Sequence, residues 1–201
     1  MTKLPVTVEV VLFTIRDRRL HLLLTRREGP AHRYALPGGL VREAEPLDVA
    51  AARALGGETG AGKVYLEQLY TFGDLPHGSV DRVITVAYYA LVPHTHVPRS
   101  GTDAAWFPIA ELPALGAGHR RIVDYARQRI RNKLDYTNVG FELLPDRFTL
   151  TELQLVHEAI AGEPLDKRNF RRKIIQKGIV KPTREWQSTG RKPAQLYRFR
   201  Q

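Results

Sequence analysis

The stretch that decides the fold is residues 36–60, which read LPGGLVREAEPLDVAAARALGGETG. The double glycine Gly38-Gly39 breaks the chain, and a helical pattern follows from about Pro46 to Thr59. Proline suits a first helical turn, and Gly60 suits a C-terminal stop. We therefore predict a glycine turn that leads into an alanine-rich helix.

Strand patterns surround this turn and helix. Alternating apolar residues run over 6–12, and a turn at 17–19 leads into a second extended run over 20–25. The later patterns are strand-like runs at 64–72 and 82–92 and a longer helix at about 119–133. Strands with interspersed helices indicate an α/β domain with a mixed sheet.

The last third of the chain has a different outline. The pattern loses its period over 134–145, where we place a linker. Thr149 and Glu152 have the spacing of a capping box at the start of a helix. The expected elements are a helix at 150–161, a second helix from Asp166 to a stop at Gly178, and a hairpin formed by 179–186 and 194–199. Two helices, a tight turn and a basic hairpin outline a winged helix-turn-helix.

The composition describes a folded chain with a strongly basic C-terminal part. Charged residues make up 26% and apolar residues 43% of the 201 positions, which is globular rather than disordered composition. The formal net charge is +10. Residues 1–144 hold 18 basic and 15 acidic side chains, whereas residues 145–201 hold 13 and 6. Such an asymmetry is typical of a separate nucleic-acid-binding module.

The absence of cysteine excludes disulfides, thiolate zinc sites and cysteine nucleophiles, and it favours a reducing compartment. The longest apolar run, 83–92, is about half of the roughly 20 residues that a membrane helix needs. Pro5 and Glu9 stand where a secretory signal would carry its apolar core. We therefore expect a cytoplasmic protein with no membrane partner.

The spacing within 36–60 resembles the Nudix hydrolase box. The matching positions are Gly39, Glu45, Arg53, Leu55, Glu58 and Gly60. Two of the three helix carboxylates of the box are missing, because Ala54 and Gly57 stand in their places and leave only Glu58. Hydrolysis of a diphosphate needs Mg²⁺ or Mn²⁺ held by several converging carboxylates. We therefore predict no catalytic residues, no metal site and no efficient hydrolysis.

Motifs along nearly the whole chain extend the resemblance. They are the runs 34–39, 65–74, 106–108, 111–113, 133–138, 141–145, 165–173 and 195–199. Together with the degenerate box they resemble the Nudix-related transcriptional regulators of NAD metabolism. The resemblance implies a bacterial homodimeric repressor that binds a palindromic operator in double-stranded DNA. It also implies that ADP-ribose or a related nucleotide acts as effector in the Nudix domain, with no required cofactor.

The second helix of the winged pattern carries the candidate DNA contacts. Projection at about 100° per residue places Phe170, Ile174 and Ile175 on one apolar face. Arg, Asn and Gln on the opposite face are side-chain types that bind guanine or adenine bidentately. The predicted DNA-binding residues are Lys167, Arg168, Asn169, Arg171, Arg172, Lys173 and Gln176, with Arg191 and Lys192 at the wing tip as phosphate contacts.

Candidate effector contacts lie in and around the box. Arginines there could hold a diphosphate, aromatic side chains could stack an adenine, and glycines allow close backbone approach. The predicted effector-binding residues are Arg26, Arg33, Gly38, Gly39, Arg53, Glu58, Tyr70 and Phe72. For Arg53, an ion pair with Glu45 or Glu58 that braces loop and helix is an equally good expectation. For the aromatic side chains the alternative is core packing, and we expect His94 and His96 in an exposed loop rather than at a metal.

Two other functions stay open at this point. An active ADP-ribose or nucleoside-diphosphate hydrolase would use Glu58 with Glu43 or Glu45 as replacement metal ligands. A Nudix-derived RNA-binding protein would need aromatic side chains for base stacking near the basic helix, where they are sparse. We favour a regulator in which residues 1–140 form the effector-sensing Nudix domain and residues 145–201 the DNA-binding domain.

Overall fold

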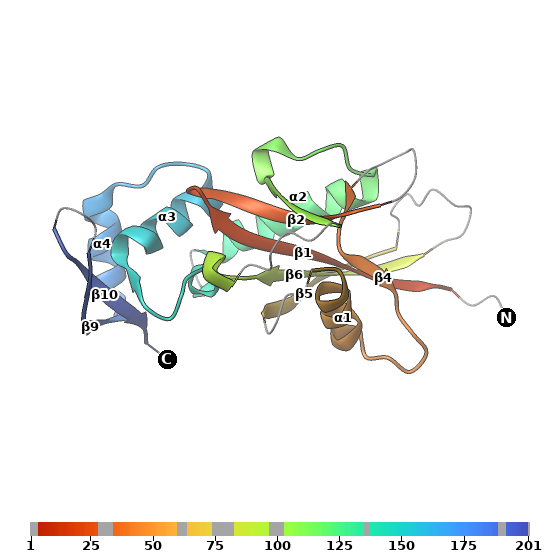
Figure 1. Cartoon of the computed structure of the whole chain (residues 1–201), viewed down its shortest axis with the longest axis horizontal. Helices are drawn as coiled ribbons and strands as arrows, with labels where there is room; N and C mark the ends of the chain where they lie inside the picture. The colour runs from red at the N-terminus through yellow and green to blue at the C-terminus, as the bar shows by residue number, and fades with distance from the viewer. Residues whose placement is uncertain are drawn as a thin grey trace.

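The computed structural model describes residues 4–27, 34–59, 64–73, 83–96, 103–134, 137–188 and 192–200, without the side chains of 57–59. Figure 1 shows an elongated molecule, with a large sheet flanked by helices at one end and a small helical domain with a hairpin at the other.

A mixed sheet forms the larger part. Its strands are β1 (Val6–Arg16), β2 (Arg19–Arg26), β3 (Tyr34–Ala35), β4 (Gly38–Leu40), β5 (Tyr65–Phe72), β6 (Ile84–Leu91) and β7 (Ala104–Pro108). The order is β3-β2-β1-β6-β5, with β4 paired to β1 and β7 paired to β2. Strands β1 and β6 are parallel, and the other pairs are antiparallel. The prediction of an α/β domain with a mixed sheet is confirmed.

Helices α1 (Leu47–Thr59) and α2 (Ala117–Lys133) cover opposite faces of this sheet. Side chains alternate along β1, so Val10 belongs to the core that contains Leu55 of α1, while Val11 belongs to the core that contains Ile122 of α2. The helix expected from 36–60 is present, but the expected glycine turn is wrong, because Gly38 and Gly39 lie in strand β4, which pairs with β1, and the turn before α1 falls at Glu43 and Ala44. Within the described part of the chain, no helix is long and apolar enough to span a membrane.

Short 3-10 helices occupy several connections, namely η1 (His94–His96), η2 (Ile109–Glu111) and η3 (Val139–Leu143). The two histidines of η1 are exposed, as expected. Helix η3 lies in the segment predicted as a linker, and its Val139, Gly140 and Leu143 are buried. The connection between the two parts is therefore a packed element of the fold.

The C-terminal part is a winged helix-turn-helix with α3 (Leu150–Ala161), α4 (Lys167–Gln176) and a sheet ordered β8-β10-β9. Its strands are β8 (Phe148–Thr149), β9 (Val180–Gln187) and β10 (Ala194–Phe199). The capping box is present, because Thr149 Oγ1 accepts from the Glu152 amide at 3.1 Å and Glu152 Oε2 accepts from the Thr149 amide at 2.7 Å. Gly162 ends α3 with φ 79°, a left-handed value that favours glycine.

One apolar core runs through both parts. It continues from Ile130 of α2 through Val139 of η3 to Leu153 of α3 and Phe170 of α4. The Phe141 ring lies 5.5 Å from that of Phe148 and 4.7 Å from that of Phe199, measured between centroids. The turn between β1 and β2 also points toward α3 (Figure 1). The winged part is thus packed directly onto the sheet domain.

Candidate nucleic-acid interface and ligand site

The turn between α3 and α4 is held by one buried amide and one carboxylate. Gln154 donates to Glu158 Oε1 at 2.9 Å and to the Leu165 carbonyl at 3.0 Å, and the Leu165 amide donates to the same Glu158 oxygen at 3.0 Å. The hydrogen bonds that Glu158 accepts from the Leu165 amide and from Gln154 lower its pKa. Asp166 then caps α4 by accepting from the Asn169 amide at 2.8 Å. The angle between the helices is fixed by these contacts.

Helix α4 turns its apolar side inward and its basic side to solvent. Phe170 and Ile174 are buried, whereas Lys167, Arg168, Asn169, Arg172, Lys173 and Gln176 are exposed. The expectation for Ile175 is wrong, because its side chain is 56% exposed. A position five residues after Phe170 lies about 140° around the helix from it, too far to share the buried face.

The cations of α4 differ in how freely they can reach a ligand. Arg171 is half-buried, and its Nη2 donates to Thr151 Oγ1 on α3 at 3.0 Å. Arg172 donates to the Asn169 side-chain oxygen at 3.0 Å, which pairs two side chains that the sequence predicts to contact bases. Within the described residues, no carboxylate forms an ion pair with the cations of this helix. Such a cluster is suited to phosphate and base contacts.

The wing is a two-stranded ribbon formed by β9 and β10. Gln195 braces it by donating to the Thr183 carbonyl at 2.6 Å, and Glu185 on the ribbon forms an ion pair with Arg147. Lys192 is exposed near its tip, and Arg191 lies outside the described residues.

The two glycines of the box have different surroundings. A Cβ on Gly38 would lie 2.4 Å from Glu9 Oε2 and 2.5 Å from the Val8 carbonyl oxygen, because β4 is pressed against β1. A Cβ on Gly39 would meet nothing within 4 Å. Gly38 is therefore required for strand packing, while Gly39 leaves open space beside the helix.

Arg53 forms an ion pair with Glu45 and so links the loop before α1 to the helix, which is one of the two arrangements that the sequence predicts for it. Its Nε and Nη2 donate to the two carboxylate oxygens of Glu45 at 2.7 and 2.8 Å, and Nη2 also donates to the Leu40 carbonyl at 3.1 Å. Glu45 further accepts from the Arg42 amide at 2.9 Å. The hydrogen bond from Arg53 and that from the Arg42 amide lower the pKa of Glu45 to about 2. Glu45 is thus ionised and already fully engaged by its neighbours.

Among the described residues, the remaining box positions do not form a metal-binding site. Ala54 is buried against the sheet, and no group of three His, Asp or Glu side chains there could hold a metal ion. The side chain of Glu58 and all of Arg33 lie outside the described residues. Arg26 is exposed at the end of β2. The prediction that the box does not hydrolyse a diphosphate stays a prediction.

The aromatic candidates lie on the α2 side of the sheet, away from the box helix. A β-bulge between Gln68 and Tyr70 leaves Tyr70 49% exposed and Phe72 only 1% exposed. The centroid of the Tyr70 ring lies 5.1 Å from that of Phe72 and 5.1 Å from that of Tyr125, which belongs to α2. Phe72 therefore supports Tyr70 from beneath and has no face open to a ligand. The structure does not bring these two rings together with Arg53.

Strand β5 and helix α2 are joined by a row of contacts from one side of the helix, at positions 121, 125, 129 and 133. The guanidinium carbon of Arg121 lies 5.4 Å from the centroid of the Phe72 ring, and Arg129 donates to the Leu69 carbonyl at 3.2 Å. Lys133 donates to both carboxylate oxygens of Glu67 at 2.6 Å. The row fixes α2 to the edge strand of the sheet along its whole length.

Glu67 is the centre of a half-buried cluster. It accepts from the Tyr65 hydroxyl, from the Tyr89 hydroxyl at 2.8 Å and from Lys133. Burial alone would raise the pKa of Glu67, but these hydrogen bonds outweigh it and the pKa lies below its usual value. Burial raises the pKa of the Tyr89 hydroxyl. The charge on Glu67 is therefore paired with that on Lys133.

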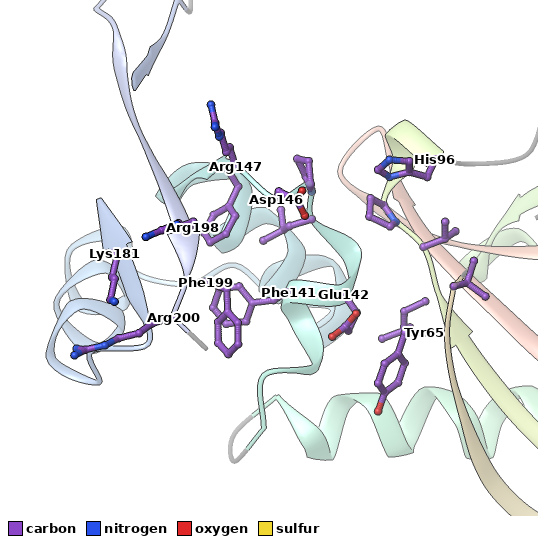
Figure 2. Close-up of a pocket in the computed structure, with 17 residues that line it drawn as sticks. Tyr65, His96, Phe141, Glu142, Asp146, Arg147, Lys181, Arg198, Phe199 and Arg200 are labelled. Carbon is purple, nitrogen blue, oxygen red and sulfur yellow. The ribbon is translucent and has the colours of Figure 1, made fainter. Parts of the chain in front are cut away.

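A cleft of about 890 Å³ lies between the sheet domain and the winged domain. Figure 2 shows cations of the winged end, among them Lys181, Arg198 and Arg200, on one side of it, and Tyr65 on the other. Glu142 of η3 also lines it, and burial raises the pKa of this carboxyl. The lining comes from five separate segments, so this cleft has no local signature in the sequence.

Comparison with known families agrees with both parts of this architecture. Residues 3–126 match the NUDIX domain, and residues 140–199 match the NrtR DNA-binding winged helix domain. An Acinetobacter baylyi protein named ADPR responsive transcriptional repressor NtrR is 34% identical over 96% of this chain and 81% of its own length. The chain belongs to the NrtR family of Nudix-related proteins. The resemblance found in the sequence is confirmed.

Two solved structures from this family match the chain. Shewanella oneidensis NrtR complexed with a 27mer DNA has a TM-score of 0.85 at 33% identity, over 97% of this chain and 93% of that one. The NUDIX domain of the same NrtR, complexed with ADP ribose, matches with a TM-score of 0.56 at 30% identity, over 65% of this chain and 90% of that one.

Sequence reasoning missed three features of this NrtR-family chain. The first is the exposure of Ile175, which the sequence pattern assigns to the core. The second is the ion pair of Glu67 with Lys133, which joins residues 66 positions apart in the sequence. The third feature is the row along α2, whose spacing of four is visible in the sequence but whose partner strand is not. The exposure of Ile175 could have been predicted, because Phe170 and Ile174, one turn apart, already define the buried face of α4.

Proposed function

We propose that this protein is a transcriptional repressor that binds a palindromic operator as a homodimer and responds to ADP-ribose. The observation that carries the proposal is the basic solvent-facing side of α4, in a chain whose fold matches DNA-bound Shewanella NrtR over 97% of its length. In this proposal residues 145–201 bind DNA, residues 1–140 sense the effector, and the regulated genes belong to NAD metabolism.

Two-fold symmetry would place two α4 helices in major grooves about 34–36 Å apart, one turn of B-DNA, or at a multiple of that distance. Base contacts come from Arg168, Asn169, Arg172 and Gln176, and phosphate contacts from Lys167, Arg171, Lys173, Arg191 and Lys192. Arg171 supports this division, because its tie to Thr151 holds the guanidinium at the edge of the exposed face.

For the effector we propose ADP-ribose at the Nudix domain, on the α2 side of the sheet, where the Tyr70 ring is exposed. The relative whose NUDIX domain was crystallised with ADP ribose supports this ligand class. Tyr70 offers an exposed ring for stacking, and Phe72 supports that ring from beneath, whereas Arg53 is paired with Glu45 at the box helix and not at this ring.

The route from effector to DNA follows from the shared core. Tyr70 touches Tyr125 on α2, α2 leads into η3, and buried η3 side chains pack with α3. A ligand that favours one position of α2 would change the placement of the winged domain. By linkage, ADP-ribose and DNA must then alter each other's affinity by the same factor, typically about 5–150-fold.

The test is a titration of labelled operator with protein at several ADP-ribose concentrations, with AMP as a matched control ligand. Curves that shift with ADP-ribose and not with AMP support the proposal. Superimposable curves would leave a DNA-binding protein without a sensor.

We also infer that the Nudix domain does not turn over ADP-ribose, because Ala54 and Gly57 replace two metal-binding carboxylates and Glu45 is engaged by Arg53. Incubation with Mg²⁺ or Mn²⁺ and measurement of released AMP test this directly. A turnover of about 1 per second, within the ordinary range of enzymes, would refute it and favour the hydrolase.

A further inference from the structure

Ile175 is an exposed aliphatic side chain on a helix face that is otherwise polar. Its 56% exposure contrasts with the burial of Ile174, its neighbour in the sequence. A β-branched residue has a lower helix propensity than the Lys or Arg that would be ordinary at an exposed position. Its neighbours one turn earlier are Arg171 and Arg172, and Arg168 lies two turns away on the same side.

The position of Ile175 on the helix can be worked out from the two buried residues. Phe170 and Ile174 define the inward direction, and Arg172 points about 180° from it. At about 100° per residue, Ile175 lies about 60° from Arg172 on one side, and Asn169 lies about 60° from it on the other. Ile175 is therefore as close to the centre of the exposed face as a side chain predicted to read bases.

The major groove offers one apolar group to such a side chain, the C5-methyl group of thymine. Arg, Asn and Gln can distinguish purines by hydrogen bonds, but none of them detects this methyl group. We propose that Ile175 contacts a thymine methyl group in each half-site and so selects thymine at one operator position. This inference rests on the proposed DNA-binding function. The cations around Ile175 favour a duplex at this face, because their charge is complementary to that of the phosphates.

The test compares thymine with deoxyuridine, which lacks only the C5-methyl group and keeps the base-pairing edge. Each thymine of the protein's selected operator is replaced singly by deoxyuridine, and the dissociation constants of full-length wild-type protein and of Ile175→Ala are measured. At one thymine per half-site we expect wild type to lose affinity about four-fold, which corresponds to about 0.8 kcal/mol for one buried methyl group. We expect Ile175→Ala to lose nothing further there.

Two variants keep the result interpretable. Val49→Ala removes an exposed aliphatic side chain from α1, far from α4 in the fold, and it should respond to deoxyuridine as wild type does. Ile175→Val keeps most of the contact and should give an intermediate loss, which also protects the test if the alanine variant folds poorly.

The outcomes separate the inference from the function on which it rests. Equal losses for wild type and Ile175→Ala at every thymine would overturn the role of Ile175 and leave the repressor intact. A change in self-association of Ile175→Ala without any base-dependent effect would assign the side chain to a protein contact and overturn it too. Failure of wild type to bind any duplex specifically would overturn both.

Discussion

Replacing Lys133 by methionine keeps an unbranched apolar stem at the end of α2 and removes the charge that faces Glu67. Lys133 makes two hydrogen bonds of 2.6 Å to this carboxylate, and the two side chains are only 15% and 30% exposed. A hydrogen bond to a charged group contributes about 1.5–3 kcal/mol, and removal of one partner leaves the other half-buried and uncompensated. Because Glu67 is partly exposed, water solvates it in the variant and reduces the resulting loss of stability.

We therefore expect Lys133→Met to lower the free energy of unfolding by about 2 kcal/mol, which is about 4–8 °C in Tm for a chain of this size. The matched control is Arg120→Met on the same helix, where the ion pair with Asp124 is more than half exposed on both sides and should contribute less than about 0.5 kcal/mol. Calorimetry or thermal circular dichroism measures both. A Tm for Lys133→Met within about 1 °C of the control would refute the reasoning.

The same pair gives a pH dependence with a definite sign. The pKa of Glu67 is lowered in the folded state, so its stabilisation is present above the ordinary carboxyl pKa of about 4.3 and is lost as pH falls through the folded value. Lys133→Met removes the main cause of the lowered pKa. The difference in stability between wild type and variant should therefore shrink as pH falls below about 4.3.

Three further predictions concern single positions. Arg172→Ala should cost about 1–3 kcal/mol of operator binding and relax preference at one base position, whereas Arg191→Ala should weaken all duplexes alike and reduce the salt slope by about one, as measured by anisotropy. Gly38→Ala should destabilise the fold by about 1–3 kcal/mol because its Cβ would overlap the Val8 carbonyl, while Gly39→Ala should be neutral or stabilising; equal Tm values for the two would contradict the packing argument. Thr149→Ala should cost about 1 kcal/mol in urea denaturation through loss of the capping box.

Local signals in the sequence predicted the elements whose ends are set by neighbouring residues. Helix α3 begins after the Thr149 capping box and ends at Gly162, as expected, because both caps act within four residues of the helix. The start of α1 just after Pro46 and the antiparallel pairing of β1 with β2 across Asp17 and Arg18 follow from equally local chemistry. The family resemblance then supplied the architecture that joins these elements.

Side-chain environments set by distant contacts could not be predicted in the same way. The bulge after Gln68 decides that Tyr70 is exposed and Phe72 buried, and nothing in the strand pattern marks it. Arg53 was equally suited to a diphosphate or to Glu45, and only the folded loop shows the second arrangement. Ile175 is exposed because the buried face of α4 is narrower than the span of its three apolar residues, and Phe170 and Ile174 already fill it.

The core that continues from α2 through η3 into α3 has a consequence for protein engineering. A DNA-binding domain joined by a loose tether can be grafted onto another sensor as a cassette. Here such a graft would cut through the packing of Phe141 against Phe148 and Phe199, and the exchanged half would meet a foreign surface. Functional hybrids between relatives therefore require η3 and the α2 residues that pack with it to be transferred together with the winged half, so that the interface is inherited as one unit.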